Sequence, residues 1–247
     1  MRDAVCVTVD VEDFYEGMAV LGHNVPRPPG APSGLGPLLE RLDAVPSRPL
    51  VTLFVVANYA PAVQAELAAF AAAGHEIASH GPDHGRLPAG GVAGWLRSGR
   101  EKLEDLLGVP VRGFRSPRFD VPADAGLDRY RDELAEAGYQ YVSDAARLGT
   151  RSPVREVPVL SWRGVRVGGG SYQRLLPFAA VAAAAQRCRG PAVLYYHSYD
   201  FDGTLPAMTA VRSPMLARQL VGRSRIAPIV WRLLERFGSE TCAHATR

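Results

Sequence analysis

Two histidines with a spacing suited to a metal site stand out in the sequence. His80 and His84 lie four residues apart in EIASHGPDHGR, residues 76–86, and are two of only six histidines in the chain. Gly81, Pro82 and Asp83 between them disfavour a regular helix, so we expect a loop. Imidazole is a common ligand of divalent transition metals. The pair therefore indicates a metal site, although two histidines at this spacing also arise by chance.

Three further polar clusters follow apolar, strand-like segments. They are Asp10-Val11-Glu12-Asp13, Arg115-Ser116-Pro117-Arg118 and Tyr196-His197-Ser198. Each alone has an ordinary explanation, such as a helix cap, a surface arginine or a structural histidine. The carboxyl ends of parallel strands, however, gather at one edge of a sheet, where α/β enzymes place their catalytic groups. Four such clusters together predict one site.

Strand-like and helix-like segments alternate along the chain and would position these clusters. Strands are predicted at 4–11, 49–57, 76–80, 111–119, 140–145 and 191–200, with a short strand pair at 154–162 and 165–172. Helices are predicted at 34–45, 61–75, 91–108, 125–139, 177–190, 213–220 and 226–238. The alternation predicts an α/β fold with a mostly parallel sheet. No internal repeat or linker interrupts it, so we expect one domain over residues 1–247.

Composition narrows the class of protein. The formal net charge is only +3, from 28 Lys and Arg against 25 Asp and Glu, which argues against a nucleic-acid partner. No apolar run is long enough to span a bilayer, and the N-terminus lacks a signal-peptide pattern. Three widely spaced cysteines, Cys6, Cys188 and Cys242, imply no disulfide framework. We expect a cytoplasmic protein without stable membrane insertion, whose oligomeric state the sequence leaves open.

The four clusters, in this order, resemble a known family. The segments TVDVEDF, HEIASHGPDH, RGFRSPRF and VLYYH are similar to the ordered motifs of the polysaccharide deacetylases, the carbohydrate esterase family 4 or NodB-homology group. GGGSYQRLLPF and YYHSYDFD further resemble the branch associated with exopolysaccharide export. The resemblance implies a deformed (β/α) barrel of about seven strands. It also implies metal-dependent removal of an acyl group from an amino sugar.

The resemblance implies that His80, His84 and one carboxylate hold a divalent metal, with zinc the expected ion. Side chains at positions i and i+2 of a strand face the same way, which favours Glu12 as the ligand beside Asp10. If the strand breaks at Val11, Asp13 takes this place instead. A metal held in this way would polarise an amide carbonyl and lower the pKa of water.

The remaining roles also follow from the resemblance. Asp10 matches the general base, and Arg115 the arginine that keeps this base ionised and oriented. The backbone N–H of Arg118, which follows Pro117, matches an oxyanion donor, although arginine is unusual there and suggests an anionic group on the substrate. His197 matches the general acid.

A carboxylate is expected to raise the pKa of His197. Asp144 is the first candidate for this carboxylate and Asp200 the second. Besides Pro117 and Arg118, the residues expected to bind substrate are Gly169, Gly170, Tyr172 and Tyr196.

We therefore predict a metal-dependent N-deacetylase whose partner is an N-acetylated sugar, as a glycoside, a lipid- or nucleotide-linked sugar, or a polysaccharide. One alternative is hydrolysis of another amide, such as a formamide or a cyclic ureide. Another is a noncatalytic sugar-binding protein on the same fold. Binding alone does not require Asp10, His80, His84, Arg115 and His197 together, which favours an enzyme.

Overall fold

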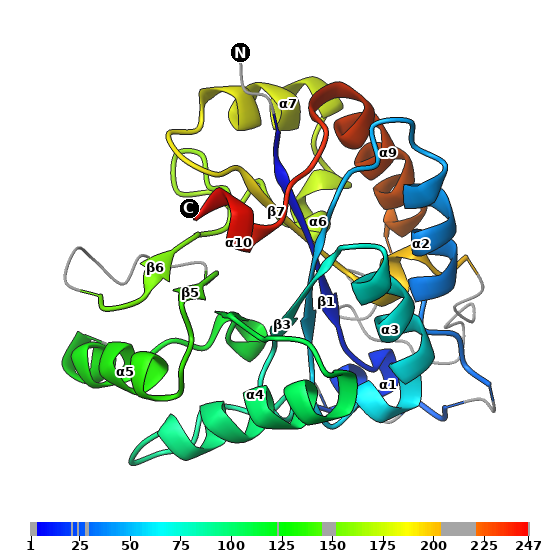
Figure 1. The fold of residues 1–247 in the computed structure, drawn as a ribbon. Helices are drawn as coiled ribbons and strands as arrows, with labels where there is room; N and C mark the ends of the chain where they lie inside the picture. Colours follow the sequence, from blue (N-terminus) through cyan, green and yellow to red (C-terminus); the bar gives the residue numbers. More distant parts are fainter. Residues whose placement is uncertain are drawn as a thin grey trace.

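Seven parallel strands form a curled, open sheet, with helices packed around its outside (Figure 1). The computed structural model describes residues 4–20, 22–23, 25–27, 30–122, 124–144, 152–203 and 221–246. The strand order is β6-β5-β4-β3-β2-β1-β7, so the first and last strands of the chain are neighbours. This architecture confirms the predicted deformed (β/α) barrel of seven strands.

The longest strands, β1 and β7, lie at one end of the sheet, and the strands β4, β5 and β6 at the other end have two residues each. Their bounds are β1 Cys6–Val11, β2 Thr52–Val55, β3 Glu76–Ser79, β4 Gly113–Phe114, β5 Tyr141–Val142, β6 Arg155–Glu156 and β7 Val193–His197. Strand pairing is therefore most extensive around β1 and is limited to one or two residue pairs from β3 to β6.

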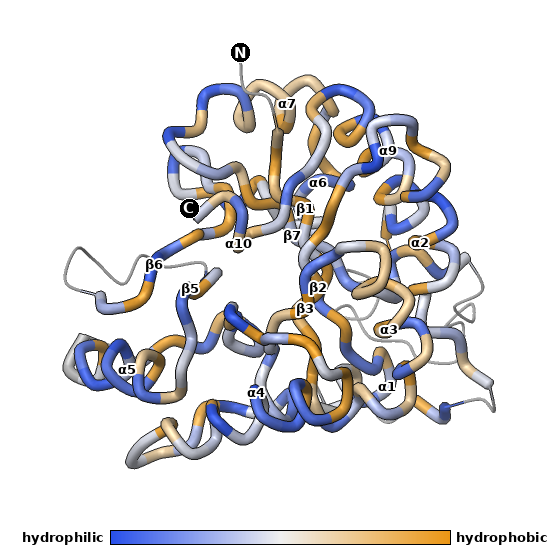
Figure 2. Tube along the Cα trace, viewed as in Figure 1, coloured by the Kyte–Doolittle hydropathy of each residue, from blue (hydrophilic) through white to orange (hydrophobic). Residues whose placement is uncertain are grey.

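Helices and short 3-10 turns connect the strands. They are α1 Phe14–Val20, α2 Leu35–Asp43, η1 Ala60–Val63, α3 Gln64–Ala72, α4 Ala93–Leu107, η2 Pro117–Phe119, α5 Asp124–Glu136, α6 Gly170–Gln173, α7 Phe178–Arg187, η3 Ser198–Phe201, η4 Arg223–Arg225, α9 Ile226–Phe237 and α10 Cys242–Ala245. Figure 2 shows apolar residues concentrated in the central strands, whereas the surrounding helices carry both polar and apolar residues. Amphipathic helices of this kind bury one face against a sheet.

Alternation along β1 separates the two faces of the sheet. Val5, Val7, Val9 and Val11 belong to the large apolar cluster that includes the buried helix residues. The residues between them point the other way, and Cys6 packs in a smaller cluster with interior residues of β2, β3 and β7. Polar groups at the carboxyl end of β1 are thereby directed into the barrel.

The segment around the glycine loop differs from the predicted strand pair. Trp162 and Val165 form an isolated antiparallel bridge, Gly169 forms a parallel bridge with Tyr195, and α6 begins at Gly170. A Cβ on Gly168 would come within 2.6 Å of the Val193 carbonyl oxygen. The glycines thus allow this backbone to lie directly against β7. Pairing with the preceding segment is limited to the Trp162–Val165 bridge and the hydrogen bond from the Gly168 N–H to the Leu160 carbonyl.

Three short elements complete the comparison with the predicted segments. The sequence reasoning missed the helices α1 and α10, and the predicted helix at 213–220 lies outside the described residues. Among the helices that the structure describes, none combines the length and the apolar character needed to cross a membrane.

Candidate active site

Strand register brings the first acid cluster and His197 together. In the parallel pairing of β1 with β7, Asp10 is opposite His197. On the other side of β1, β2 and β3 lead to His80, whose N–H donates to the Val55 carbonyl at 2.8 Å. Segments about 190 residues apart in sequence therefore meet at the carboxyl edge of the sheet.

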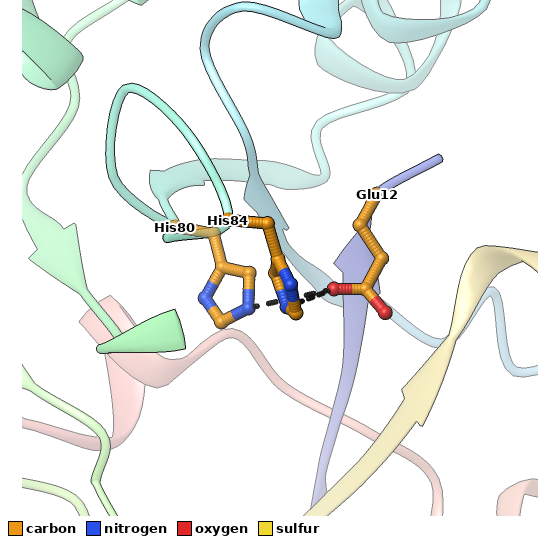
Figure 3. A group of neighbouring side chains, drawn as sticks. All are labelled: Glu12, His80 and His84. Carbon is orange, nitrogen blue, oxygen red and sulfur yellow. Dashed lines mark ion pairs between the residues drawn. The ribbon is translucent and has the colours of Figure 1, made fainter. Parts of the chain in front are cut away.

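Glu12, His80 and His84 form a compact cluster at this edge. Figure 3 shows the three side chains pointing toward one another, with Glu12 from the end of β1 and the histidines from the loop after β3. One ligand atom from each lies within 4.8 Å of the others. The Oε2 atom of Glu12 is 4.0 Å from His80 Nε2 and forms a closer ion pair with His84 Nε2. The donors face a common point.

Asp13, the alternative metal ligand, lies outside this cluster. Its carboxylate accepts the backbone N–H of Tyr15 at 2.9 Å and forms an ion pair with Arg27. Asp13 immediately precedes α1, so the first contact is that of a helix cap. Because β1 continues through Val11, the i and i+2 alternation directs Glu12 inward.

The protonation states of His80 and Glu12 suit a divalent metal ion. His80 Nδ1 lies 2.9 Å from the Arg115 carbonyl oxygen, which can only accept, so Nδ1 carries the proton and Nε2 is left as a ligand. Burial lowers the pKa of His80 to about 4, which keeps the ring neutral. Burial of Glu12 raises its pKa, but the imidazoles around it, His84 first, outweigh this effect and lower it to about 2.

A carboxylate oxygen without a hydrogen-bond partner also indicates a metal site. Apart from the His84 contact, Glu12 Oε2 is buried without a hydrogen-bond partner among the described residues. Buried carboxylate oxygens normally have such partners. One carboxylate and two imidazoles fit zinc or an ion of similar preference, so these residues suit the group that the family implies.

Backbone contacts fix the loop that carries the two histidines. The carbonyl groups of Gly81 and Pro82 accept the N–H groups of Ala57 and Asn58, each at 2.9 Å. Gly81 has φ of 84°, and a Cβ there would come within 2.4 Å of the Trp95 ring. Only glycine fits both the left-handed backbone and the close approach of the indole.

Asp10 is held by a buried arginine. Arg115 Nη1 donates to Asp10 Oδ1 at 2.6 Å and to the Thr8 hydroxyl at 2.9 Å. Its Nε and Nη2 donate to the carbonyl and hydroxyl of Ser143, at 2.9 and 2.8 Å. Arg115 is fully buried, so these acceptors are what makes its charge tolerable in the interior. The arrangement fixes the Asp10 carboxylate in one orientation.

His197 is paired with Asp200, and the expectation that Asp144 is its partner is wrong. Its Nδ1 lies 3.5 Å from Asp200 Oδ2, which also accepts the His197 backbone N–H at 3.0 Å. Burial lowers the pKa of His197, but the hydrogen bond to Asp200 and then the charge of Glu12 outweigh it and raise the pKa to about 9. The imidazole is therefore protonated at neutral pH.

Asp144 instead supports the chain after β4. It accepts the backbone N–H of Ser116 at 2.9 Å, the Ser116 hydroxyl at 2.6 Å and the Tyr130 hydroxyl at 3.2 Å. Burial raises its pKa despite these bonds. The Asp144 carboxylate thus fixes the segment between Arg115 and Pro117 and not the imidazole.

Tyr199 completes the surroundings of His197 and was missed in the sequence. Its ring stacks on His197, with centroids 4.8 Å apart and planes within 6°. Its hydroxyl donates to Glu12 Oε1 at 3.3 Å. Tyr199 follows His197 by two residues in YYHSYD, but η3 places it by a turn, so strand alternation gives no signal for it.

A cavity of about 310 Å³ opens over these groups. Its walls come from β1, α1, the histidine loop, η2, the glycine segment and β7, and its lining residues are Asp10, Glu12, Gly17, Met18, His80, His84, Arg118, Phe119, Arg166, Ser171, Tyr195, His197 and Tyr199. Six residues were expected to bind substrate, and only Arg118 is among these. Pro117, Gly169, Gly170 and Tyr196 are buried outside the lining, and Tyr172 is exposed outside it.

Tyr195 lines the cavity, where the sequence reasoning expected Tyr196. His197 and Tyr195 are two residues apart on β7 and so face the cavity together, whereas Tyr196 faces the helices and donates to Gln173 at 2.6 Å. Period-two alternation counted back from His197 would have identified Tyr195.

The chain turns sharply beside the cavity at Arg118 and Phe119. Their φ values are 60° and 56°, a conformation that costs free energy in residues other than glycine and is concentrated at functional sites. Within the described residues, the Arg118 backbone N–H has no hydrogen-bond partner. That donor is available at the cavity wall.

Family models match two consecutive parts of the chain. Residues 48–142 match the model described as polysaccharide deacetylase. Residues 135–247 match a domain of unknown function, DUF3473. No curated protein matches the chain. The branch associated with exopolysaccharide export is named by neither model and stays a prediction.

Several solved structures share the fold. A candidate polysaccharide deacetylase from Mycobacterium smegmatis is 23% identical, with a TM-score of 0.61, over 92% of this chain and 84% of that one. Puue allantoinase is 17% identical, with a TM-score of 0.61, over 99% and 89%. The Bc1960 peptidoglycan N-acetylglucosamine deacetylase is 13% identical, with a TM-score of 0.56, over 99% and 88%. At these identities the likeness establishes the fold, and the match of residues 48–142 assigns that part of the chain to the polysaccharide deacetylase family.

Proposed function

We propose that this protein is a metal-dependent hydrolase that removes an N-acetyl group from an amino sugar. Family membership supports a deacetylase or a related amidohydrolase. The observation that carries the narrower proposal is the convergence on one cavity of Glu12, His80 and His84 with Asp10 and His197. Both matched regions contribute to this cavity, because β7 lies beside β1, which supports one catalytic domain over residues 1–247.

The proposed reaction attacks the acetamido carbonyl with water and releases acetate and a free amine. Glu12, His80 and His84 would hold the divalent ion, which when bound polarises the carbonyl and acidifies water. Asp10, oriented by Arg115, takes the proton from the attacking water. The C–N bond then breaks, and the nitrogen takes a proton from the Nε2 side of His197, because Nδ1 faces Asp200.

Charge that develops on the carbonyl oxygen needs a donor. The unpaired backbone N–H of Arg118 lies at the cavity wall and suits this task, because a fixed donor stabilises an oxyanion without reorganising. The left-handed turn at Arg118 and Phe119 holds the donor in place.

The test combines metal content with hydrolysis. Purified protein should contain a divalent metal, release acetate from methyl N-acetylglucosaminide, lose this activity on chelation and regain it when zinc is added. Because Puue allantoinase has the same fold, allantoin is assayed in parallel. Hydrolysis of allantoin alone would contradict the sugar substrate. Metal-free protein that is inactive on both amides would favour a noncatalytic sugar-binding protein.

The variant His80→Ala separates metal binding from folding. It should remove bound metal and turnover, while the thermal unfolding midpoint in chelator stays close to that of the wild type. Metal content equal to that of the wild type would contradict the ligand role of His80.

A further inference from the structure

We infer that the sugar substrate carries an anionic group, and that Arg118 and Arg166 bind it. This inference rests on the proposed function, because it names the substrate class of the same cavity. Both arginines line the cavity together with Phe119, Ser171 and Tyr195. They come from separate segments, η2 and the chain before the glycine loop, and Arg166 contacts the ring of Phe119, which follows Arg118 directly.

Among the described residues, no acid neutralises the two arginines. Among the ion pairs and hydrogen bonds of the described residues, none involves the side chain of Arg118 or Arg166. Arg166 is half-buried, and its guanidinium lies 5.5 Å from the Phe119 ring centroid. A guanidinium against an aromatic ring keeps its in-plane N–H groups free to donate.

The carboxylates of the cavity are already engaged by other groups. Asp10 is paired with Arg115, and Glu12 faces the two metal-site histidines. Neither is in ion-pair contact with Arg118 or Arg166. The positive charge on this wall therefore lacks a counterion from the described part of the chain, and a ligand is the group that would supply one.

A row of neighbouring rings connects Arg166 with His197, the proposed proton donor. Arg166 contacts Phe119, the Phe119 ring is 4.9 Å from the Tyr195 ring, and the Tyr195 ring is 6.0 Å from His197. An anionic group bound to the arginines thus belongs to the same ligand whose amide nitrogen faces His197. Arginine binds phosphoryl and carboxylate groups through paired N–H donors, so both are included in the proposed class.

Three probes distinguish the sources of the charge. Methyl N-acetylglucosaminide is neutral, N-acetylglucosamine 1-phosphate carries a phosphoryl group, and N-acetylmuramic acid carries a carboxylate. For the wild type we expect kcat/KM for one anionic probe to exceed that for the neutral probe by about tenfold or more, as for hydrogen bonds to charged groups. Which probe is preferred identifies the group. Raising the salt concentration should increase KM for that probe and leave the neutral KM unchanged.

The double variant Arg118→Gln/Arg166→Gln should remove this preference, so that the ratio of kcat/KM for the anionic probe to kcat/KM for the neutral probe falls toward one. Glutamine is shorter and uncharged but still polar, and it leaves the Arg118 backbone N–H in place. Arg163→Gln is the matched control, since Arg163 is exposed outside the cavity and contacts Trp162. This control should keep the wild-type ratio between anionic and neutral probes.

The inference is overturned if the wild type prefers the neutral probe, or if the double variant keeps the anionic preference. Equilibrium binding separates this result from a failure of the proposed function. If no probe is hydrolysed, the proposed function fails, and calorimetric dissociation constants of the same probes still decide the inference. Tighter binding of an anionic probe by about tenfold, lost in the double variant, supports the anion site, and equal binding of all three refutes it.

Discussion

The floor and the rim of the cavity differ in whether their charged side chains have ionic partners. On the floor, defined by Asp10, Glu12, His80, Arg115 and His197, charged groups are buried or nearly so and have partners within the protein. On the rim, defined by Arg118, Phe119, Arg166 and Ser171, the two arginines have no acidic partner among the described residues. A buried charge without a partner is costly, whereas a charge that reaches water is not. Under the proposed function, the paired charges belong to the groups that do chemistry, and the unpaired charges belong to the groups that bind substrate.

Removing the base should give the largest effect and test whether the floor is the catalytic part. Asp10→Asn keeps an oxygen that accepts from Arg115 but cannot take a proton. We expect kcat to fall about 100- to 10,000-fold while bound metal is retained. Steady-state kinetics and metal analysis measure the two effects. Near-normal turnover would mean that Asp10 is not the base.

Replacing an arginine in each region should show the difference in stability. Arg115→Met leaves Asp10 buried and unpaired, and we expect the free energy of unfolding to fall by about 3–5 kcal/mol. The same change on the rim, Arg118→Met, should alter it by less than about 0.5 kcal/mol, because that side chain is exposed. Urea denaturation measures both. Equal losses in the two variants would remove the distinction between floor and rim.

The smallest effect is a shift in pH dependence. The pKa of His197 is raised to about 9, so the acid is protonated below that pH and activity falls as pH rises through it. Asp200→Asn removes the neighbouring charge, lowers this pKa and should move the alkaline limb of kcat/KM to lower pH. Activity near pH 6 should change little, because the imidazole is still protonated there.

Asp144→Asn is the control for this shift. Asp144 contacts Ser116 and Tyr130, so its replacement should leave the alkaline limb in place even if stability falls. A limb that moves in Asp144→Asn but not in Asp200→Asn would show that the partner of His197 is misassigned.

Local pattern was sufficient for much of the fold and for the floor of the site. Apolar runs marked the strands, and glycine and proline marked helix ends, which predicted an α/β fold with a mostly parallel sheet. The barrel of about seven strands came from the family resemblance, and the structure has seven strands. Alternation along β1 favoured Glu12 over Asp13, and the structure places Glu12 in the cluster. These features depend on residues within a few positions of one another, which a sequence records directly.

The walls of the cavity were harder to predict. Tyr195 was overlooked although alternation on β7 indicated it, and Tyr199 lies in a 3-10 turn where alternation no longer applies. The glycine segment was read as a strand, because nothing local reveals that its backbone packs against β7. The unpaired state of Arg118 and Arg166 depends on every neighbour that surrounds them, and several come from remote segments.

The sequence by itself determined which side chains stand at the ends of strands, because strand periodicity and breaker residues act over a few positions. Only the tertiary structure decided which of these ends meet: that His197 pairs with Asp200, that Asp144 holds Ser116, and that two arginines share a wall. The physical reason is that these side-chain contacts form between segments that the sheet brings together. Strand register and packing decide which residues meet there, whatever their separation along the chain.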